Sequence, residues 1–467
     1  MPAYDALVIG AGMSGLAAGI RLAQFDRRVL LVERHSLWGG LNSFYKRQGR
    51  RLDTGLHALT NFVPKGTPNA PLTKLLRQLR IPYDALQLGE QTWSEIRTRD
   101  VRLRFANGFG LLEEDVATVF PACRDGFARL VRAIDAYELQ LSSNAPRSAR
   151  AVVAEYIADP LLADLLFLPI AYYGSAQEND VDWESFVILF KSLYREGFAR
   201  PEGGIKRMLD LLIARYREAG GELRMRCGVQ ELVVERASGP ARDECRVRGA
   251  ILDDGTHVEA EHVLSSAGFV ETMRLAGRTT PAAASGQMTF VETIAVTNRP
   301  LAALGHEATL TFFLHGERFH YAKPDALVDL RSGVICATDN YKTQAPPTEG
   351  LLRLTSIASY DHWRALASDE YAAEKLRASE RMIEAASAFV PDPRPHTVFC
   401  DVATPMTIER YTGRVNGAVY GSPRKTASGE TGIGGLFLVG TDQGLLGVVG
   451  ALLSGILMAN RHALVAR

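Results

Sequence analysis

The pattern of apolar positions at the amino end predicts three elements in close succession. A short apolar run over 6–9 enters a glycine-rich turn, which leads into an apolar stretch over 16–23. A second apolar run over 28–32 ends on an acidic residue, Glu33. Short apolar runs are typical of buried strands, and the longer stretch after the turn is typical of a helix. The predicted order is therefore strand, glycine turn, helix and strand.

The hydrophobic spacing changes along the rest of the chain. From about 112 to 197 it is mostly helical, and an amphipathic helix is expected over 205–219, ended by Gly220. A further helix is expected over 371–389, ended by Pro391. The strand-like runs between these helices predict a second sheet, and they cover 289–297, 309–314, 333–338 and 352–359.

The glycines of the first turn have separate physical roles. Gly10 permits a tight turn, Gly12 lets the backbone approach a diphosphate, and Gly15 lets the helix pack closely on the strand. The helix amino end offers unpaired N–H groups to the phosphates, and Glu33 is placed to accept hydrogen bonds from ribose hydroxyls. The turn therefore predicts a dinucleotide site for FAD or NAD, because the acid disfavours NADP. A plain glycine-rich loop is the alternative.

The residues after Glu33 resemble a known superfamily. Gly39-Gly40 is followed by Leu41-Asn42 and then by Asp53-Thr54-Gly55. An acid, a short spacer, a glycine pair and an Asp-x-Gly motif resemble the amino-terminal region of the flavoprotein amine oxidase and phytoene desaturase superfamily. This resemblance favours FAD over NAD. The superfamily usually has an arginine after the glycine pair, and Leu41 stands there in this chain, which leaves the diphosphate charge to the helix dipole and the backbone.

The carboxyl end resembles the same superfamily. An apolar run over 435–439 leads into Gly440-Thr441-Asp442, and a glycine-rich apolar stretch follows. The resemblance implies that this stretch closes the flavin site, with Asp442 bonding a ribityl hydroxyl or lying near the diphosphate. A helix that starts near Gly447 would point its amino end at the N1–C2 edge of the flavin, where its dipole raises the reduction potential.

The resemblance thus implies an FAD site assembled from three parts of the chain, in which the backbone of Val229 pairs with the adenine. The expected cofactor-binding residues are Gly10, Gly12, Met13, Ser14, Gly15, Glu33, Arg34, Gly39, Gly40, Leu41, Asn42, Gly55, Leu56, His57, Val229, Ala267, Gly440, Asp442, Gly447, Val448 and Val449.

A further signature lies ahead of the carboxyl strand. The segment 403–411 contains Thr-Pro and Glu-Arg-Tyr, and 417–421 reads Gly-Ala-Val-Tyr-Gly. These motifs closely resemble phytoene desaturases, carotenoid isomerases and retinol saturase-like proteins. The resemblance implies carbon–carbon dehydrogenation of a hydrophobic, isoprenoid substrate by hydride transfer to flavin N5, with quinone or oxygen as the electron acceptor. Isomerisation and saturation use the same site. The alternatives are an amine oxidase or protoporphyrinogen oxidase-like enzyme, and a non-enzymatic prenyl-lipid escort of the GDP-dissociation-inhibitor type.

The expected fold class is α/β. It combines a discontinuous Rossmann-like FAD-binding domain of the GR2 type with an α+β substrate domain that has an antiparallel or mixed sheet and a helical insertion. The FAD-binding domain is predicted over 1–85, 200–285 and 402–467. The substrate domain is predicted over 86–199 and 286–401, with its helical subdomain at about 112–197.

Three residues are candidates for the substrate side of the site. His57, two residues after Gly55, is the candidate polar group near the flavin, and Tyr172 and Tyr411 are candidates for the substrate channel. Structural roles are the alternative for all three, since buried aromatic residues are usually core. No metal site is expected, because the 10 histidines have no metal-ligand spacing and the 5 cysteines are scattered.

Composition narrows the expected partners. The formal net charge is +0, which gives no electrostatic support for nucleic-acid binding. The amino end enters the first strand without a basic region, so no signal peptide is expected. The apolar runs over 161–173 and 445–458 fall short of the roughly 20 residues that a bilayer requires. We therefore expect a cytoplasmic protein, and peripheral contact with the inner face of the membrane stays open.

Overall fold

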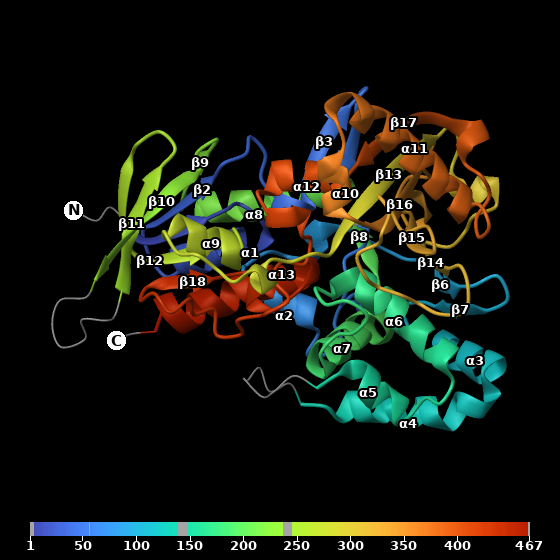
Figure 1. Cartoon of the computed structure of the whole chain (residues 1–467). Helices are drawn as coiled ribbons and strands as arrows, with labels where there is room; N and C mark the ends of the chain where they lie inside the picture. The colour runs from blue at the N-terminus through green and yellow to red at the C-terminus, as the bar shows by residue number, and fades with distance from the viewer. Residues whose placement is uncertain (1–3, 56, 139–146, 237–244, 466–467) are drawn as a thin grey trace.

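The computed structural model describes residues 4–55, 57–138, 147–236 and 245–465. Two seven-stranded sheets lie side by side, the first on the left of Figure 1 and the second on the right. In the first sheet, five strands run parallel in the order β18-β12-β1-β2-β9, and β10 and β11 extend it antiparallel from β12. Its strands are β1 (Tyr4–Ile9), β2 (Val29–Glu33), β9 (Glu222–Met225), β10 (Val229–Arg236), β11 (Cys245–Leu252), β12 (His257–Ser265) and β18 (Leu436–Leu438).

The strand residues of the first sheet alternate between two cores. Ala6 and Val8 of β1 face a helical layer made of α1 (Met13–Ala23), α8 (Ile205–Glu218) and α13 (Gly447–Met458). Leu7 and Ile9 face the opposite side, where β10, β11 and α9 (Phe269–Leu275) cover the sheet. Both faces of the parallel strands are buried, which explains why their sequences are continuous apolar runs.

The second sheet is mixed, in the order β17-β13-β16-β15-β14-β6-β7, with β14 and β6 parallel and the other pairs antiparallel. Its strands are β6 (Ser94–Arg97), β7 (Arg102–Phe105), β13 (Thr289–Thr297), β14 (Leu310–Leu314), β15 (Ser332–Ala337), β16 (Gly350–Ala358) and β17 (Thr397–Ala403). The predicted strand at 289–297 is confirmed residue for residue, and the other three differ by one or two residues at their ends.

Helices cover the two faces of the second sheet. One face packs on α10 (Tyr360–Ala365) and α11 (Ser368–Ala386). The other face packs on the predicted helical region, which lies at the lower right in Figure 1. Its helices are α3 (Gly110–Val119), α4 (Arg124–Ala136), α5 (Ala149–Ala154), α6 (Pro160–Gly174) and α7 (Trp183–Phe190), followed by a π-helical turn over Lys191–Glu196.

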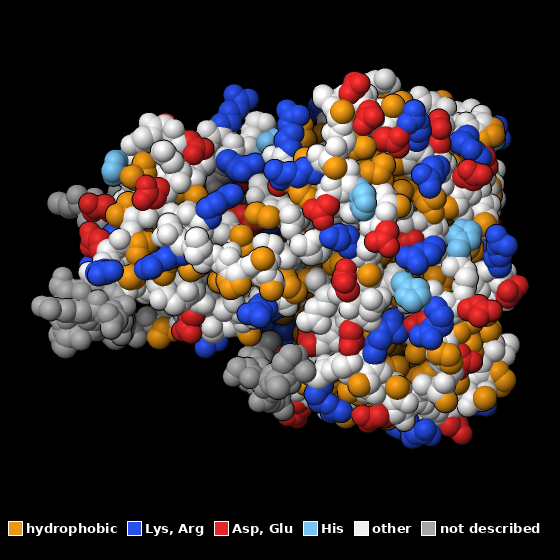
Figure 2. Space-filling view, viewed as in Figure 1, with side chains coloured by type: hydrophobic (Ala, Val, Ile, Leu, Met, Phe, Trp, Pro, Cys, Tyr) orange, Lys and Arg blue, Asp and Glu red, His pale blue; other side chains and the backbone are white. Residues whose placement is uncertain are grey.

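Smaller elements lie between the two sheets. They are the pairs β3 (Phe44–Arg47) with β4 (Arg50–Asp53) and β5 (Leu88–Glu90) with β8 (Ala199–Pro201), and the helices α2 (Pro71–Gln78) and α12 (Pro405–Thr412). On the face in Figure 2, positive and negative side chains are interspersed, as the balanced charge predicts. In the described parts of the chain, no helix is long and apolar enough to cross a membrane.

A close helix contact allows us to predict a stability effect. A Cβ on Gly455 of α13 would lie 2.1 Å from the Ser14 carbonyl oxygen of α1. Gly455→Ala should therefore lower the free energy of unfolding by about 1–3 kcal/mol, because the two helices must separate. Urea unfolding followed by circular dichroism measures this. Gly110→Ala is the matched control, because nothing lies within 4 Å of its Cβ position. Equal stability of the two variants would contradict the predicted contact.

Candidate functional site

The first glycine turn has the close contacts that its sequence predicts. Gly10 has a φ of +95°, and a Cβ there would lie 2.3 Å from Ser266 Oγ. A Cβ on Gly15 would lie 1.9 Å from the Gly10 carbonyl oxygen. Only glycine at these positions lets α1 start directly at the carboxyl end of β1. Gly12 is the N-cap residue of α1, and Met13 and Ser14 form its first turn.

Two further loops approach this turn through glycine. The Gly39 N–H donates to the Ala11 carbonyl oxygen at 2.8 Å. Gly40 has a φ of +59°, and its Cβ position lies 3.6 Å from Gly12 Cα. Leu41 and Asn42 follow in a short 3-10 helix, and a Cβ on Gly55 would lie 2.4 Å from the Leu41 carbonyl oxygen. The loops at Gly12, Gly39 and Gly55 thus approach one another through backbone atoms. Larger residues at these glycines would fill the space between them. Leu56 lies outside the described residues.

A buried carboxylate lies beside the turn. One oxygen of Glu33 accepts from the Ala11 N–H at 2.8 Å and the other from the His35 N–H at 2.9 Å. Each carboxylate oxygen can accept a further hydrogen bond. Val229 starts β10 close to this point, because a Cβ on the preceding Gly228 would lie 3.1 Å from Arg34 Cβ. The predicted ribose and adenine residues are therefore neighbours.

The carboxyl segment reaches the same turn from another side. Gly440 has a φ of +87°, and a Cβ there would lie 2.6 Å from Ser14 Oγ. Gly447 starts α13, and its Cβ position has nothing within 4 Å. Val448 and Val449 follow as buried residues of the first turn. A side chain at the first position of α13 would therefore point into open space.

Asp442 is bonded to protein groups on both of its oxygens. Its Oδ1 accepts from the Ser422 N–H at 2.8 Å, and its Oδ2 accepts from the Phe269 N–H at 2.5 Å. The Arg414 guanidinium donates to Oδ2 at 3.3 Å. Burial alone would raise the pKa of Asp442, but Arg414 and Lys425 outweigh burial and lower it. Asp442 thus ties the loop after β12, which contains Ala267, to two carboxyl-terminal segments.

His57 belongs to a buried charged cluster on the second sheet. Its Nε2 lies 3.1 Å from Glu292 Oε1 and 3.2 Å from Thr355 Oγ1. Arg353 donates to the same carboxylate at 3.0 and 2.7 Å. Burial lowers the pKa of His57. Burial alone would raise the pKa of Glu292, but Arg353 and His57 lower it to about 2. A neutral imidazole held by a carboxylate can receive or release a proton.

The two candidate tyrosines lie in different places. Tyr172 is buried, with its hydroxyl 3.1 Å from Ser332 Oγ and its ring 5.7 Å from that of Phe290. Phe290 and Glu292 are two residues apart on β13, so Tyr172 and His57 lie along the same face of the second sheet. Tyr411 is 51% exposed, and its ring contacts His35 next to Glu33. The structure therefore groups Tyr411 with the glycine turn and apart from the His57 cluster.

Sequence reasoning missed four residues at this site. Glu292 and Arg353 lie within otherwise apolar strands, and Thr355 and Arg414 are buried polar residues. A charged residue inside a predicted buried strand was an available signal, because such residues are rarely buried unless they are paired.

Comparisons with known proteins identify the family of the chain. A family profile described as flavin containing amine oxidoreductase matches residues 13–461. The chain belongs to this family. The prediction of a flavin-dependent oxidoreductase similar to phytoene desaturases and carotenoid isomerases is thereby confirmed.

Individual members of the family resemble the chain over almost its whole length. It is 22% identical over 511 residues to a chloroplastic prolycopene isomerase of Arabidopsis thaliana, covering 98% of this chain and 82% of that protein. It is 25% identical over 548 residues to an all-trans-retinol 13,14-reductase of Danio rerio. This match covers 98% of this chain and 86% of that protein. The crystal structure of an oxidoreductase from Methanosarcina mazei has the same fold, with a TM-score of 0.67, 18% identity and coverage of 97% and 99%.

The His57 cluster predicts how stability of this flavin oxidoreductase depends on pH. The pKa of His57 is below its usual 6.5 in the folded chain, so the unfolded chain binds more protons as the pH falls below 6.5. Stability should therefore fall on acidification, by up to about 1.4 kcal/mol per pH unit from this one residue. His57→Gln should make the fall shallower in urea unfolding at pH 7.0, 6.0 and 5.0. His320→Gln, at an exposed position, is the control. An unchanged slope in His57→Gln would contradict the assignment.

Proposed function

We propose that this protein binds FAD and oxidises, isomerises or saturates a carbon–carbon bond of a hydrophobic isoprenoid. The observation that carries the proposal is the meeting of three glycine loops beside the buried carboxylate of Glu33. A flat backbone surface next to a helix amino end and a ribose acceptor is what an adenine dinucleotide requires. Prolycopene isomerase and retinol reductase, which resemble this chain, are named for isoprenoid substrates.

We assign the FAD site to the residues that the sequence predicted. Gly10, Gly12, Met13, Ser14 and Gly15 would hold the diphosphate, with Gly39, Gly40, Leu41 and Asn42 on its other side. Glu33 and Arg34 would hold the ribose and Val229 the adenine. Gly55, Leu56, His57, Ala267, Gly440, Asp442, Gly447, Val448 and Val449 would surround the ribityl chain and the flavin. We propose a GR2-type FAD-binding domain with the predicted boundaries. The parallel strands β9-β2-β1-β12-β18, which come from three parts of the chain, support a discontinuous domain.

A buried arginine, Arg414, is a candidate for the charge that the superfamily's usual arginine would supply. Arg414 is 7% exposed, and its guanidinium makes two long contacts, to Asp442 at 3.3 Å and to the Ser266 carbonyl oxygen at 3.5 Å. Ser266 in turn packs against Gly10, so Arg414 lies close to the turn proposed for the diphosphate. We propose that Arg414 balances phosphate charge in place of the arginine that the superfamily usually has after its glycine pair.

In the proposed chemistry, FAD transfers the hydride and the protein handles the proton and positions the substrate. Bound FAD supplies a hydride acceptor and donor at N5. His57, neutral and fixed by Glu292, would take or return the proton at its imidazole nitrogen. The aromatic residues along the second sheet, among them Tyr172 and Phe290, would bind the apolar chain and exclude water. The choice of quinone or oxygen as electron acceptor and peripheral contact with a membrane stay predictions.

Cofactor content tests the FAD site. The purified protein should be yellow, or become so with added FAD, and flavin fluorescence titration should give one site per chain. Gly12→Val should abolish this binding, because its side chain fills the gap to Gly39. Arg414→Gln should weaken binding about tenfold, whereas Gly110→Ala should leave it unchanged. If the protein stays colourless after FAD is added, the flavoenzyme assignment is wrong and the lipid-escort alternative remains.

Anaerobic reduction tests the substrate class. The FAD-loaded protein is mixed with phytoene, hydroxysqualene, retinol or a primary amine, and the flavin absorbance near its long-wavelength maximum is followed. We expect bleaching by an isoprenoid and none by the amine. His57→Gln should slow the bleaching by a factor of about 10²–10⁴, which is typical for a lost general acid or base. Bleaching by the amine alone would favour the amine oxidase alternative.

A further inference from the structure

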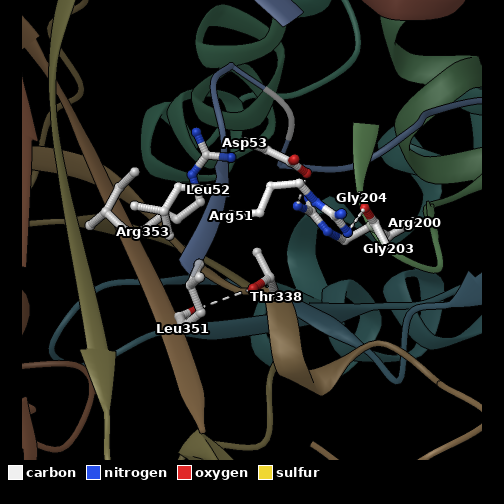
Figure 3. A pocket seen from close by; sticks show the side chains of 10 residues that line it. Arg51, Leu52, Asp53, Arg200, Gly203, Gly204, Thr338, Leu351 and Arg353 are labelled. Carbon is white, nitrogen blue, oxygen red and sulfur yellow. Dashed lines mark hydrogen bonds and ion pairs between the residues drawn. The ribbon is translucent and has the colours of Figure 1, made fainter. Parts of the chain in front are cut away.

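A cavity of about 210 Å³ lies behind the His57 cluster, between β4, the turn before α8 and the second sheet. Figure 3 shows its lining, in which three arginines converge from three different segments. The lining residues are Arg51, Leu52, Asp53, Arg200, Gly203, Gly204, Ile294, Thr338, Leu351 and Arg353. At about 30 Å³ for one water, the cavity holds about seven waters or a compact chemical group. It is far too small for FAD.

The three arginines bring positive charge to the cavity, and two of them are paired with carboxylates. Arg200 donates to Asp53 at 2.5 Å, and Arg353 is paired with Glu292. Arg51 donates to the Gly203 carbonyl oxygen at 2.9 Å, and no carboxylate among the described residues forms an ion pair with it. A further carboxylate, Asp339, lies next to Thr338, and its oxygens accept from the backbone N–H groups of Leu301 and Leu351, which favours its charged form. Burial nevertheless raises the pKa of Asp339.

The amino end of α8 adds to this positive potential. Gly203 and Gly204 both have positive φ values, and α8 has no acidic residue in its first turn. The Ile205 N–H donates to Asp53 Oδ2 at 3.0 Å, so the helix end and Arg200 share one carboxylate. Helix amino ends and arginines both bind phosphate oxygens well. Asp53 is a single carboxylate, so it offsets only part of the positive charge of Arg200 and the helix end.

The lining also has an apolar part. Leu52, Ile294 and Leu351 contribute it. The exposed side chain of Arg51 lies at the mouth, whereas Arg353 is 1% exposed at the inner end. A ligand with a phosphate group and a short apolar part could contact both the arginines and the apolar residues. An uncharged apolar molecule would leave Arg51 without a counter-ion.

We propose that this cavity is a phosphate-binding site, distinct from the glycine turn, that takes free phosphate or the phosphate head of a small prenyl ester. The site does not depend on the proposed FAD chemistry. It is joined to the active-site candidate through Arg200, whose guanidinium also donates to the His57 carbonyl oxygen at 3.1 Å. A bound phosphate that contacts Arg200 would therefore affect the position of the His57 backbone.

Isothermal titration calorimetry tests the site, with the protein saturated with FAD so that the glycine turn is occupied. The titrants are inorganic phosphate, dimethylallyl diphosphate and dimethylallyl alcohol at constant ionic strength. We expect millimolar or tighter binding of a phosphate-bearing titrant and none of the alcohol. Binding of inorganic phosphate identifies a free-phosphate site, and binding of the diphosphate ester alone identifies a prenyl ester site. If neither binds below 10 mM, which is roughly −3 kcal/mol, the proposal is wrong.

Two neighbouring arginines provide the matched variants. Arg51→Gln should weaken binding about tenfold and Arg51→Glu should abolish it. Arg50→Gln should leave it within twofold, because Arg50 is paired with Glu349 and does not line the cavity. Flavin absorbance, recorded on the same samples, should be unchanged in all three variants. Equal phosphate affinity of Arg51→Glu and the wild type would overturn the proposal, and failure to bind FAD would instead count against the proposed function. The titration is then repeated without FAD, where Arg51→Glu must still reduce binding.

Discussion

Backbone-to-backbone packing at the carboxyl end of β1 is the constraint on which the rest of the structure depends. Gly15 lets α1 contact the Gly10 carbonyl, Gly40 lets the second loop reach Gly12, and Gly455 lets α13 contact Ser14. These contacts bring three parts of the chain to one point, and a Cβ on Gly15 or Gly455 would lie within 2.1 Å of a backbone oxygen. Because α13 follows β18 and α8 precedes β9, fixing these helices also fixes the order of the parallel strands. The same packing that stabilises the fold thus leaves a side-chain-free surface beside Glu33.

Buried charges then join this region to the second sheet. Asp53, the last residue of β4, holds the amino end of α8 and Arg200, and Arg200 holds the His57 backbone. The His57 side chain reaches Glu292, which is paired with Arg353. Breaking one partner of a buried pair costs about 3–5 kcal/mol, because the other charge stays buried. Such a network is more sensitive to geometry than an apolar interface, so it fixes the relation between the glycine loops and the sheet that faces His57.

Much of the fold could be predicted from the sequence, because the elements are encoded by local periodicity. The first βαβ unit, the helical region and the strand over 289–297 are all continuous patterns. The His57 cluster could not be predicted in this way, because it depends on strand register. Ile294 lies opposite Arg353 and Glu292 opposite Thr355 between β13 and β16, and no local pattern determines that pairing. Tyr411 shows the same limit, since its position follows from the contact between α12 and the loop after β2.

Asp442 shows how a residue of a motif can hold several segments of the chain together. Ser422, Phe269 and Arg414 already engage both carboxylate oxygens, and Lys425 lies 3.9 Å away. A carboxylate with so many donors is a poor additional acceptor, but it is a strong means of fixing donors in place. It orients the buried Arg414, and it anchors the loop after β12 beside Gly10. The acid therefore holds a positive charge close to the glycine turn, on a segment more than 370 residues away from Gly39-Gly40 along the chain.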